Sequence, residues 1–339
     1  PAGRPGVDLT GVDAVQAQVM DEPGADSAVG IRRPWSRRSL AQERYGRRQV
    51  AVVVKRVAGV IPCMNPRDAH PDLKRDLSFF PTVNDAPRHL TGAQVRQYNE
   101  RGYIFPLDVY NATEVDANRA YFDELMKMAA AAGWDAYSIN GWQAQCAGMY
   151  DMIVEPRILD YLEDLLGTNL VCWGAHFFCK MPGDVRQVSW HQDASYWPLS
   201  PSKTVTVWLA IDDADVENGA MTVIPGSHVH GQIDFDDSTD QEHNVLNQTV
   251  NDATAYGDEP VALAMRAGQI SLHTDLLLHG SEPNRSDRRR CGLTMRFVPP
   301  DVHAHDGWNR RAITCRGSDP TGHWPHTSRP EGETIPVKS

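Results

Sequence analysis

The spacing of hydrophobic positions changes near residue 167. Before this point, apolar residues recur with the period of a helix, which predicts amphipathic helices. Thr91 is a suitable cap for the first helix, and Gly133 is a suitable end for the second. Pro156 and Gly167 occupy the favoured positions at the start and end of the third. The predicted helices span residues 90–102, 113–132 and 156–166, and a short predicted strand spans 103–107.

Short runs of strand-forming residues dominate the chain after Gly167. Turn residues such as Pro182-Gly183 and Asn218-Gly219 separate these runs. Helices followed by many short strands predict an α+β protein, in which an antiparallel barrel or jelly roll has helices packed outside. We expect strands at residues 170–178, 187–193, 204–211, 220–224, 269–272, 276–279 and 291–298.

Residues 1–75 differ from the rest, because they are rich in Gly, Pro, Ala and Arg and lack sustained apolar periodicity. We expect a disordered or non-native extension there, with Met64 as an alternative start, and an interaction arm is the second interpretation. Residues 36–40 resemble a twin-arginine export signal, but no sufficient apolar stretch follows them, so export is rejected. Residues 76–339 are expected to form a single domain.

Two segments of this expected domain lack a clear period. Residues 231–258 form an acidic insert, and a loop of this length is either a lid or disordered. Residues 300–339 are expected to cap the barrel. Their tryptophans, arginines and histidines suit a position at the mouth of the barrel, beside Tyr196 and Trp197.

Composition limits the classes of partner. The net charge of −11 argues against nucleic acid and anionic membranes. No apolar run approaches the length of a membrane span. The six cysteines form no Cys-x-x-Cys pair, so they match neither a zinc site nor a secreted disulfide framework. We interpret them as reduced thiols in a cytoplasmic protein that acts on a small molecule. The oligomeric state is not predicted.

The candidate chemistry centres on a Trp-His-Gln-Asp run. Alternate residues of a strand share one face, so His191 and Asp193 can both point into a barrel. His279 is the best third ligand, because a glycine follows it and lets the backbone approach closely. His273 is the competitor, and strand parity does not separate the two. Two imidazoles and one carboxylate suit a single Fe(II), with positions left open for a co-substrate and dioxygen.

Three arginines, Arg288, Arg289 and Arg290, open the last predicted strand. A bidentate arginine inside a closed barrel is a natural partner for a dicarboxylate such as 2-oxoglutarate. We expect one of the three to bind this co-substrate. Arg296 lies further along the strand, roughly 20 Å from Arg290 at about 3.3 Å per residue, which is too far to share the same ligand.

Taken together, these motifs resemble the phytanoyl-CoA dioxygenase family of Fe(II)- and 2-oxoglutarate-dependent oxygenases. The resemblance covers roughly residues 90–300 and implies a double-stranded β-helix of the jelly-roll or cupin-like kind. The matching motifs are Gly102-Tyr103, Glu155–Leu159, Lys180–Gly183, Trp190–Asp193, Tyr196-Trp197, Trp208, Asn218–Ala220, Pro225–His228, and His279–Ser281 with Asn284 and Arg290.

The resemblance also implies roles for single residues. His191, Asp193 and His279 fall on the family's iron ligands. The arginine that binds the distal carboxylate of 2-oxoglutarate corresponds to Arg290, so the resemblance selects one of the three candidates. The residues implied to contact the co-substrate are Arg290, Ser281, Trp208 and, as a further candidate, Lys180.

The implied activity is hydroxylation of an aliphatic C–H bond with Fe(II), 2-oxoglutarate and dioxygen, which yields succinate and CO2. The carboxylate of Asp193 favours hydroxylation, because related halogenases carry a small residue there. Desaturation, epimerisation and ring formation stay open as outcomes. We expect a small polar or anionic substrate, such as a natural-product intermediate or a small phosphonate, in contact with Tyr196, Trp197 and Arg296.

Two alternatives to this activity are retained. The first is a hydroxylase of the acyl-CoA type, although the sequence shows neither a long apolar groove nor an adenine-binding feature. The second belongs to another class, a jelly-roll metal-binding protein without oxygenase activity. A protein of the second kind has no need of Arg290 and Ser281, so production of succinate distinguishes the two classes.

Overall fold

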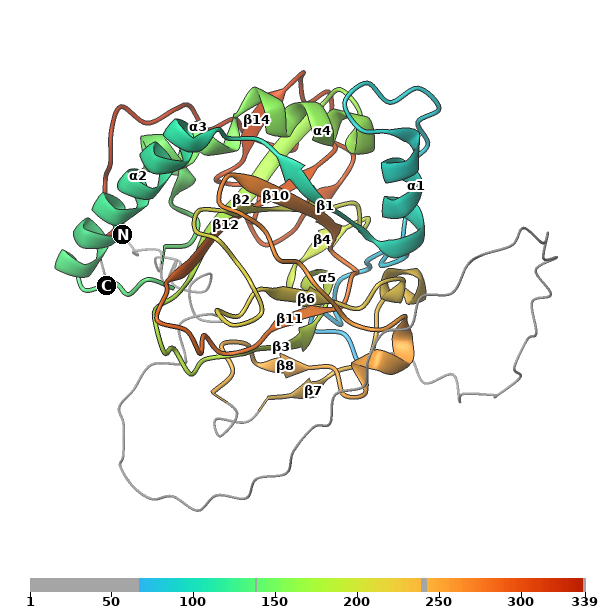
Figure 1. Cartoon of the computed structure of the whole chain (residues 1–339). Helices are drawn as coiled ribbons and strands as arrows, with labels where there is room; N and C mark the ends of the chain where they lie inside the picture. Colours follow the sequence, from blue (N-terminus) through green and yellow to red (C-terminus); the bar gives the residue numbers. More distant parts are fainter. Residues whose placement is uncertain (1–66, 138, 239–242, 338–339) are drawn as a thin grey trace, which may run out of the picture. The chain divides into compact units, whose positions relative to one another are not determined.

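The computed structural model describes residues 67–137, 139–238 and 243–337 (Figure 1). Most of the expected N-terminal extension, with Met64 and residues 36–40, lies outside the described residues. Residues 67–75 are described. The guanidinium group of Arg75 donates hydrogen bonds to the carbonyl oxygens of Ala194 (2.9 Å) and Trp197 (2.7 Å). The folded domain therefore begins earlier than the expected residue 76.

The three predicted helices are confirmed as α1 (Gly92–Arg101), α2 (Ala112–Ala131) and α4 (Pro156–Leu166). Thr91 and Asn111 each form a capping box, in which the cap side chain and the residue three positions later exchange hydrogen bonds with each other's backbone. The sequence analysis missed α3 (Ala147–Ile153), which is short and has no side-chain cap. None of the described helices combines the length and the apolar character that crossing a membrane requires.

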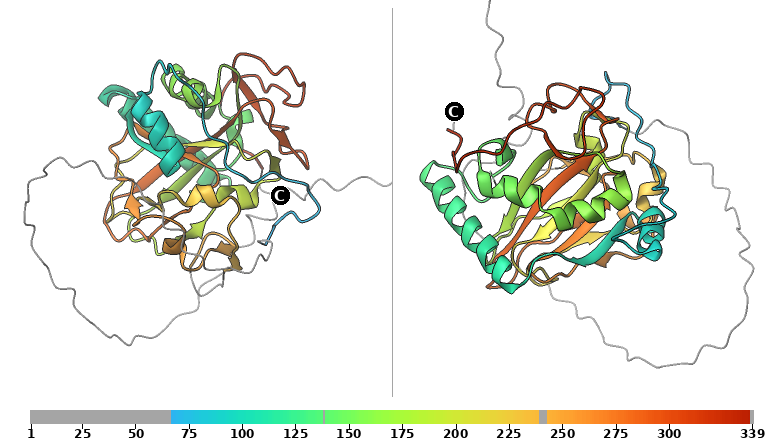
Figure 2. Two further views of the ribbon diagram at one scale, coloured as in Figure 1. Left: turned by 90° about the vertical axis from the view of Figure 1, so that its right-hand side faces the viewer. Right: turned by 90° about the horizontal axis from the view of Figure 1, so that it is seen from above.

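The larger sheet has the strand order β1-β10-β5-β12-β2-β14, and each neighbouring pair is antiparallel. Helices α2, α3 and α4 lie on its outer side, as the view from above shows (Figure 2). The strand bounds are β1 (Tyr103–Asp108), β2 (Leu170–Lys180), β5 (Val205–Ala210), β10 (Gln269–Thr274), β12 (Arg290–Val298) and β14 (Ile313–Arg316).

The smaller sheet has the order β3-β11-β6-β9 and is also antiparallel. Together with the helices outside the larger sheet, this arrangement confirms the expected α+β jelly-roll architecture. Its strands are β3 (Val188–His191), β6 (Met221–Val223), β9 (Val261–Ala262) and β11 (His279–Ser281). The remaining strands are β4 (Leu199–Ser200) with β13 (His303–Ala304), and β7 (Asp236–Asp237) with β8 (Gln248–Thr249). The remaining short helices are η2 (Trp142–Ala144), α5 (Asp193–Tyr196), η3 (Ser227–His230) and η5 (Ala253–Tyr256).

Side chains alternate between the two faces of the larger sheet. One face is apolar and packs against the helices, as the contact of Phe177 with Phe122 of α2 illustrates, with ring centroids 4.8 Å apart. Full burial of one such side chain contributes about 1.5–3 kcal/mol. The opposite, inner face carries charged, polar and small residues of the same strands, together with Trp208 and Phe178. The apolar face therefore stabilises a sheet whose inner face is available for chemistry.

Two predicted strands differ from the structure near the candidate ligands. β3 ends at His191, and Asp193 begins the short helix α5 instead of continuing the strand. The predicted strand 276–279 is absent, because Leu276, Leu277 and Leu278 form a buried turn and His279 begins β11. The N–H of Ala194 donates a hydrogen bond to the carbonyl oxygen of Asp275, and the three leucines are fully buried. In both places contacts distant in sequence override the local preference for an extended chain.

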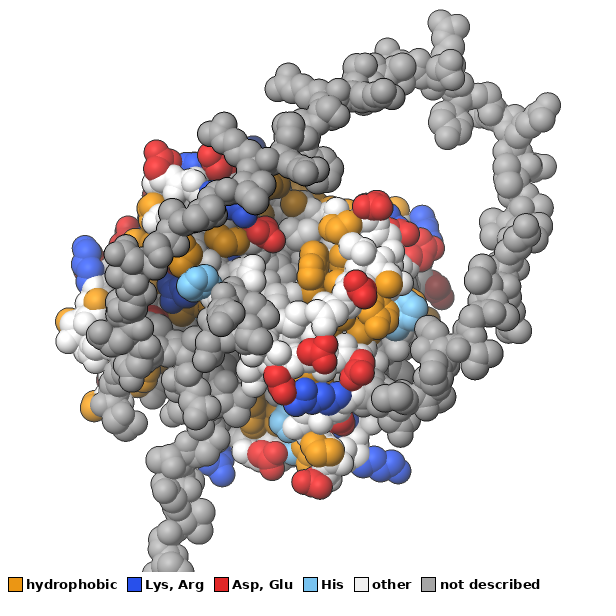
Figure 3. Space-filling view, turned by 90° about the horizontal axis from the view of Figure 1, so that it is seen from below, with side chains coloured by type: hydrophobic (Ala, Val, Ile, Leu, Met, Phe, Trp, Pro, Cys, Tyr) orange, Lys and Arg blue, Asp and Glu red, His pale blue; other side chains and the backbone are white. Residues whose placement is uncertain are grey.

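The acidic insert contains residues that pack against the domain. Ile233, Phe235 and Val250 are buried in a cluster with Ile224 and Leu278. In the same segment, the exposed strand β7 pairs with β8, whose Gln248 is buried. Figure 3 shows the face beneath the smaller sheet, where acidic, basic and hydrophobic side chains all reach the surface. The described part of the insert is therefore neither structureless nor shown to act as a lid.

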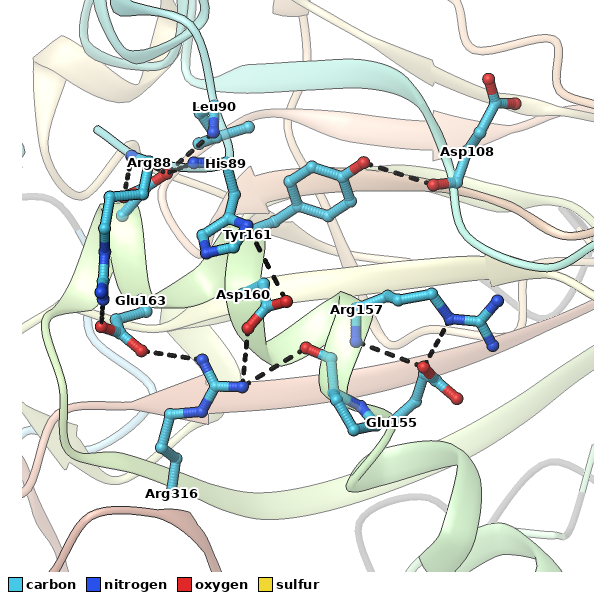
Figure 4. Close-up of polar contacts among 12 residues, drawn as sticks. Arg88, His89, Leu90, Asp108, Glu155, Arg157, Asp160, Tyr161, Glu163 and Arg316 are labelled. Carbon is cyan, nitrogen blue, oxygen red and sulfur yellow. Dashed lines mark hydrogen bonds and ion pairs between the residues drawn. The ribbon is translucent and has the colours of Figure 1, made fainter.

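A carboxylate anchors the chain that leads into α1. Asp164 of α4 accepts hydrogen bonds from the backbone N–H groups of Arg88, His89 and Leu90 at 2.7–3.0 Å. Figure 4 shows the neighbouring ion pairs, in which Arg316 of β14 contacts Asp160 and Glu163 of the same helix (2.8 and 2.7 Å). These contacts join the N-terminal segment, α4 and the edge strand β14.

We predict that Asp164→Asn lowers the free energy of unfolding by about 2 kcal/mol, because an amide replaces a carboxylate that accepts several buried N–H groups. Burial raises the pKa of Asp164, but the N–H donors of Leu90, Arg88 and His89 bring it below its usual value. A carboxyl group whose pKa is lower in the folded state stabilises the fold at pH values above its unfolded pKa, which is near 4. This stabilisation is lost as the pH falls through the folded pKa.

Urea unfolding at pH 7 and at pH 3 tests this prediction. The difference between wild type and Asp164→Asn is expected to be largest at pH 7. Asp116→Asn is the matched control, because the Asp116 side chain is 80% exposed. An equal effect of the two substitutions, or a difference that grows in acid, contradicts the anchoring role.

Candidate metal centre

Antiparallel pairing of β11 with β3 brings two candidate ligands together. His279 lies directly opposite His191 in the register of the two strands. Their ring centroids are 4.1 Å apart, and the residues are 8% and 5% exposed. Residues far apart in the sequence thus become neighbours through a single cross-strand pair.

Backbone carbonyl groups set the orientation of both imidazoles. Nδ1 of His191 lies 2.8 Å from the carbonyl oxygen of Ser189, and Nδ1 of His279 lies 2.9 Å from that of Leu277. A carbonyl oxygen only accepts hydrogen bonds, so each Nδ1 carries the hydrogen. Each Nε2 then has a free lone pair, which is the arrangement found in histidine ligands of metals.

Asp193 completes the cluster from the first turn of α5. Its Oδ1 lies 3.7 Å from Nε2 of His191 and 3.9 Å from Nε2 of His279. One donor atom from each of the three residues lies within 4.8 Å of the other two. Oδ2 faces the other way, where it accepts a hydrogen bond of 3.3 Å from Oγ1 of Thr206. This hydrogen bond aims Oδ1 at the imidazoles.

The protonation states suit a cation. Burial lowers the pKa of His279 to about 3, so its imidazole is neutral at neutral pH. Burial raises the pKa of Asp193, but hydrogen bonding with His191 and the nearby His279 bring it well below its usual value. Neutral imidazoles and an ionised carboxylate are the forms that bind a metal. Two nitrogen donors and one oxygen donor fit Fe(II) and leave further coordination positions for other ligands.

His273 lies beside this cluster without joining it. Its Nε2 is 4.0 Å from Oδ2 of Asp193, the oxygen that faces away from the other two histidines. Neither ring nitrogen of His273 has a hydrogen-bond partner in the described structure. The geometry therefore favours His279 over His273 as the third ligand. Strand parity did not distinguish these two histidines.

A second polar cluster lies at the start of β12. Arg290 is 3% exposed and lies opposite Lys180 of β2 in the strand register. Nζ of Lys180 donates a hydrogen bond of 2.8 Å to Oγ of Ser281, two residues beyond His279. Burial and the neighbouring charge of Arg290 lower the pKa of Lys180 to about 6. Strand β11 of the smaller sheet therefore connects the two clusters, because it carries His279 at one end and Ser281 at the other.

The guanidinium group of Arg290 has no ion-pair partner among the described residues, and its Nε has no hydrogen-bond partner. Its Cζ lies 5.1 Å from the ring of Trp208. A glycine is required at position 292, because a Cβ there would lie 2.0 Å from the Trp208 ring. Trp208 thus lies across the inner face of β12. The structure brings together Arg290, Lys180, Ser281 and Trp208, the four residues expected around a co-substrate.

The other two candidate arginines lie elsewhere. Arg288 pairs with Asp215 (2.8 Å) and Glu217 (3.0 Å), and its side chain is 45% exposed. Arg289 pairs with Asp212 at 2.7 Å and lies over the ring of Phe122, outside the inner face. Their charges are matched within the chain, so Arg290 alone of the three is unpaired.

The expected substrate residues are also near the centre. The ring of Tyr196 is 5.9 Å from that of His191. Trp197 is 5% exposed, and its ring lies 5.2 Å from Cζ of Arg296. Arg296 is 7% exposed and lies on the inner face of β12. Tyr196 therefore lies beside a candidate metal ligand, and Trp197 lies beside Arg296.

Sequence reasoning missed other polar residues of the inner face. The hydroxyl group of Tyr137 is buried without a hydrogen-bond partner, and the charge of Arg290 acts on it. Thr206 contacts Asp193. Trp173 lies beside Arg296, with its ring centroid 5.5 Å from Cζ. Thr206 shares strand parity with Trp208, a signal that could have identified it, whereas no sequence signal marked Tyr137, which lies outside any helix or strand.

Comparison with known proteins gives a consistent result. The sequence profile of the phytanoyl-CoA dioxygenase (PhyH) family matches residues 98–292. A protein of Stutzerimonas stutzeri named probable alpha-ketoglutarate-dependent hypophosphite dioxygenase is 26% identical over 229 residues, which cover 62% of this chain and 79% of that protein. Human peroxisomal phytanoyl-CoA dioxygenase is 29% identical over 157 residues, which cover 44% of this chain and 46% of that enzyme. The chain thus spans less than half of the human relative.

Solved structures agree with the sequence comparison. The non-haem monooxygenase ThoJ superposes with a TM-score of 0.60 at 25% identity, covering 70% of this chain and 88% of ThoJ. CytC3 with Fe(II) and alpha-ketoglutarate superposes with a TM-score of 0.54 at 21% identity, covering 74% of this chain and 98% of CytC3. The second likeness concerns the fold.

We predict that His279→Ala weakens binding of Fe(II) or Co(II) by more than about 100-fold, since loss of an outer-shell partner alone typically costs 10–100-fold. His273→Ala is the matched control, because this histidine is equally buried beside Asp193 but faces its other oxygen. Anaerobic calorimetric titration of the apo-protein measures both affinities. A large loss in His273→Ala with a small loss in His279→Ala would reverse the assignment.

Proposed function

The chain belongs to the phytanoyl-CoA dioxygenase family of Fe(II)- and 2-oxoglutarate-dependent oxygenases, and we propose that it hydroxylates an aliphatic C–H bond of a small polar or anionic substrate. One observation supports this proposal above the others. The His191, Asp193 and His279 cluster shares the interior with Arg290, a buried guanidinium group that has no anionic partner in the described chain. A metal site alone does not need such an arginine, but a metal-bound dicarboxylate does.

The geometry supports a role for each residue in this proposal. His191 and His279 bind the iron through Nε2, and Asp193 binds it through Oδ1. Arg290 binds the distal carboxylate of 2-oxoglutarate, and Ser281, which Lys180 orients, donates a hydrogen bond to the same group. The ring of Trp208 limits the space beside the co-substrate and keeps water from it.

The bound iron supplies the redox chemistry with dioxygen that amino-acid side chains lack. In the balanced reaction, the substrate R–H, 2-oxoglutarate and O2 give R–OH, succinate and CO2. One oxygen atom enters the product, and the other enters succinate. The chain contributes orientation and exclusion of water, since both ligand histidines and Arg290 are more than nine-tenths buried. The carboxylate at position 193 occupies the place that a chlorinating enzyme leaves open for halide, so hydroxylation is the proposed outcome.

The substrate class is proposed on two grounds. The inner face carries cationic and hydrogen-bonding groups, which suit an anionic or zwitterionic molecule. A relative is named for hypophosphite, which is itself a small oxyanion. A small phosphonate or an anionic natural-product intermediate is therefore the proposed substrate. An acyl-CoA substrate is the alternative, in keeping with the names of other relatives.

Anaerobic titration tests the proposal. The apo-protein is titrated first with Fe(II) and then with 2-oxoglutarate, and the weak visible charge-transfer band of the chelated iron is recorded. The expected result is a band that is absent in His279→Ala. Tight Fe(II) binding without a band would indicate a metalloprotein of another class. Succinate formation in air, screened over small phosphonates, anionic metabolites and acyl-CoA thioesters, then identifies the substrate.

We predict that Arg290→Ala raises the 2-oxoglutarate concentration needed for half of the charge-transfer band by about 30-fold or more, because truncating one partner of a buried charge pair typically costs 2–5 kcal/mol. Fe(II) affinity is expected to change little. Arg288→Ala is the matched control, since its partners are the surface residues Asp215 and Glu217. Equal co-substrate dependence in the two variants would remove Arg290 from this role.

A further inference from the structure

A second buried arginine is left without a partner by the proposed function. Arg296 is 7% exposed, forms no ion pair within 4.0 Å among the described residues, and has an Nε without a hydrogen-bond partner. The exposed arginines Arg288 and Arg329, in contrast, each contact at least one carboxylate. An unpaired buried charge is costly, so a fold that keeps one indicates an anion that binds there.

The strand register places Arg296 on the Asp193 side of the metal cluster. Arg296 of β12 lies opposite Thr206 of β5, which lies opposite His273 of β10. Residues that are paired across antiparallel strands point to the same face. Thr206 and His273 both contact Oδ2 of Asp193, at 3.3 and 4.0 Å. Arg296 therefore belongs to a row of polar side chains that is separate from the Arg290 cluster.

Two tryptophans flank the guanidinium group. Its Cζ lies 5.5 Å from the ring of Trp173 and 5.2 Å from that of Trp197, within the range of cation–π attraction. Trp173 is the extra residue of a β-bulge, because Arg296 pairs with Gly174 whereas Phe297 pairs with Cys172. A bulge next to a site re-aims a side chain, and here it turns the Trp173 ring towards Arg296.

Several buried donors around Arg296 lack acceptors. Nε1 of Trp173, Nε of Arg296 and both ring nitrogens of His273 have no hydrogen-bond partner in the described structure. In either tautomer, a neutral imidazole has one N–H donor. Buried donors are nearly always satisfied in folded proteins, so a group of them around one cation is evidence for an acceptor supplied by a ligand.

The formal charges lead to the same ligand class. The two positive charges of iron balance Asp193 and one carboxylate of 2-oxoglutarate, and Arg290 balances the other carboxylate. The positive charge of Arg296 is then not balanced in the centre, because the metal already balances the carboxylate of Asp193. A substrate with one negative charge would neutralise it.

We propose that Arg296, flanked by Trp173 and Trp197, binds an oxyanion of the substrate on the side of the centre opposite to Arg290. This inference rests on the proposed function and narrows it. The reacting bond lies close to a carboxylate or to a phosphorus oxyanion, and Arg296 determines which substrates are accepted. An acyl-CoA thioester does not fit this subsite, because it carries no charge near its reacting carbon.

Calorimetry on the loaded protein tests the assignment. Protein saturated anaerobically with Fe(II) and 2-oxoglutarate is titrated with hypophosphite, methylphosphonate or propionate. Arg296→Met keeps the volume and removes the charge, and we expect it to weaken binding of the oxyanions by about 30-fold or more. Arg296→Lys is expected to retain part of the affinity. Preference for the first two probes over propionate identifies a phosphorus oxyanion, and the reverse preference identifies a carboxylate.

The charge-transfer band separates failure of the proposed function from failure of the subsite. The 2-oxoglutarate dependence of the charge-transfer band is expected to be the same in wild type and in Arg296→Met. If wild type gives no band, the proposed function fails. If the band forms but no probe binds, or the probes bind Arg296→Met as tightly as wild type, only the oxyanion subsite is overturned.

Thermal unfolding excludes a purely structural role. Without an anion, Arg296→Met loaded with metal is expected to melt at the temperature of wild type or above, because the substitution removes an unpaired buried charge. The wild-type melting temperature is expected to rise with the bound probe, and that of Arg296→Met is not. A clear loss of stability in Arg296→Met without anion would assign Arg296 to the architecture and overturn the proposal. Arg266→Met is the control, since the Arg266 side chain is 80% exposed.

Discussion

The alternation of side chains along β12 is the constraint on which the candidate site depends. Leu293, Met295 and Phe297 enter the hydrophobic core beneath the helices. The residues between them face the interior between the sheets, where Arg290 and Arg296 are buried. A slip of one residue in the register would exchange these two sets. The apolar contacts with the helices therefore fix where the charges lie, and each large apolar side chain contributes about 1.5–3 kcal/mol to keeping them there.

Both sheets contribute residues to the candidate site. The smaller sheet supplies His191 and His279 through one cross-strand pair, while the larger sheet supplies Arg290 and Arg296, which have no ion-pair partner among the described residues. Asp193 lies between these groups, with one oxygen facing the imidazoles and the other facing Thr206. Buried cations without partners destabilise the empty protein, so binding of anions and metal is expected to stabilise it. When anions and metal are not bound, the apolar contacts between the larger sheet and the helices offset this destabilisation.

The sequence predicted the parts of this arrangement that depend on local periodicity. The bounds of α4 and the cap of α1 follow from Pro156 and Thr91, which act on their own neighbours. His191 and Asp193 were expected to converge because they occupy alternate positions of one strand. They do converge, but through the turn into α5, where a hydrogen bond from Thr206 orients the carboxylate. Their proximity in sequence was sufficient to bring His191 and Asp193 together. The orientation of the Asp193 carboxylate depends on Thr206, which belongs to the distant strand β5.

Other features depend on contacts that no local pattern encodes. Regular alternation along β2 would turn Trp173 away from Arg296, and the bulge in β2 brings its ring to the same side as Arg296. Leu276, Leu277 and Leu278 have the composition of a strand, yet they are buried in a turn before β11. In both cases the packing of the segment against the rest of the protein determines its backbone conformation, and the sequence of the segment does not. The unpaired state of Arg290 was likewise visible only in the structure, where Arg288 pairs with Glu217 and Arg289 pairs with Asp212.

The position of the two buried arginines on one strand has a consequence for specificity. Both lie on β12, but Arg290 is near Ser281, whereas Arg296 is near the bulge at Trp173. The metal ligands belong to the other sheet and to α5. Substitutions around the bulge are therefore expected to change the proposed oxyanion subsite without moving the candidate metal ligands or Arg290. On this reasoning, the family chemistry is set by the β3–β11 pair and the start of β12, and the choice of substrate is set at the far end of that strand.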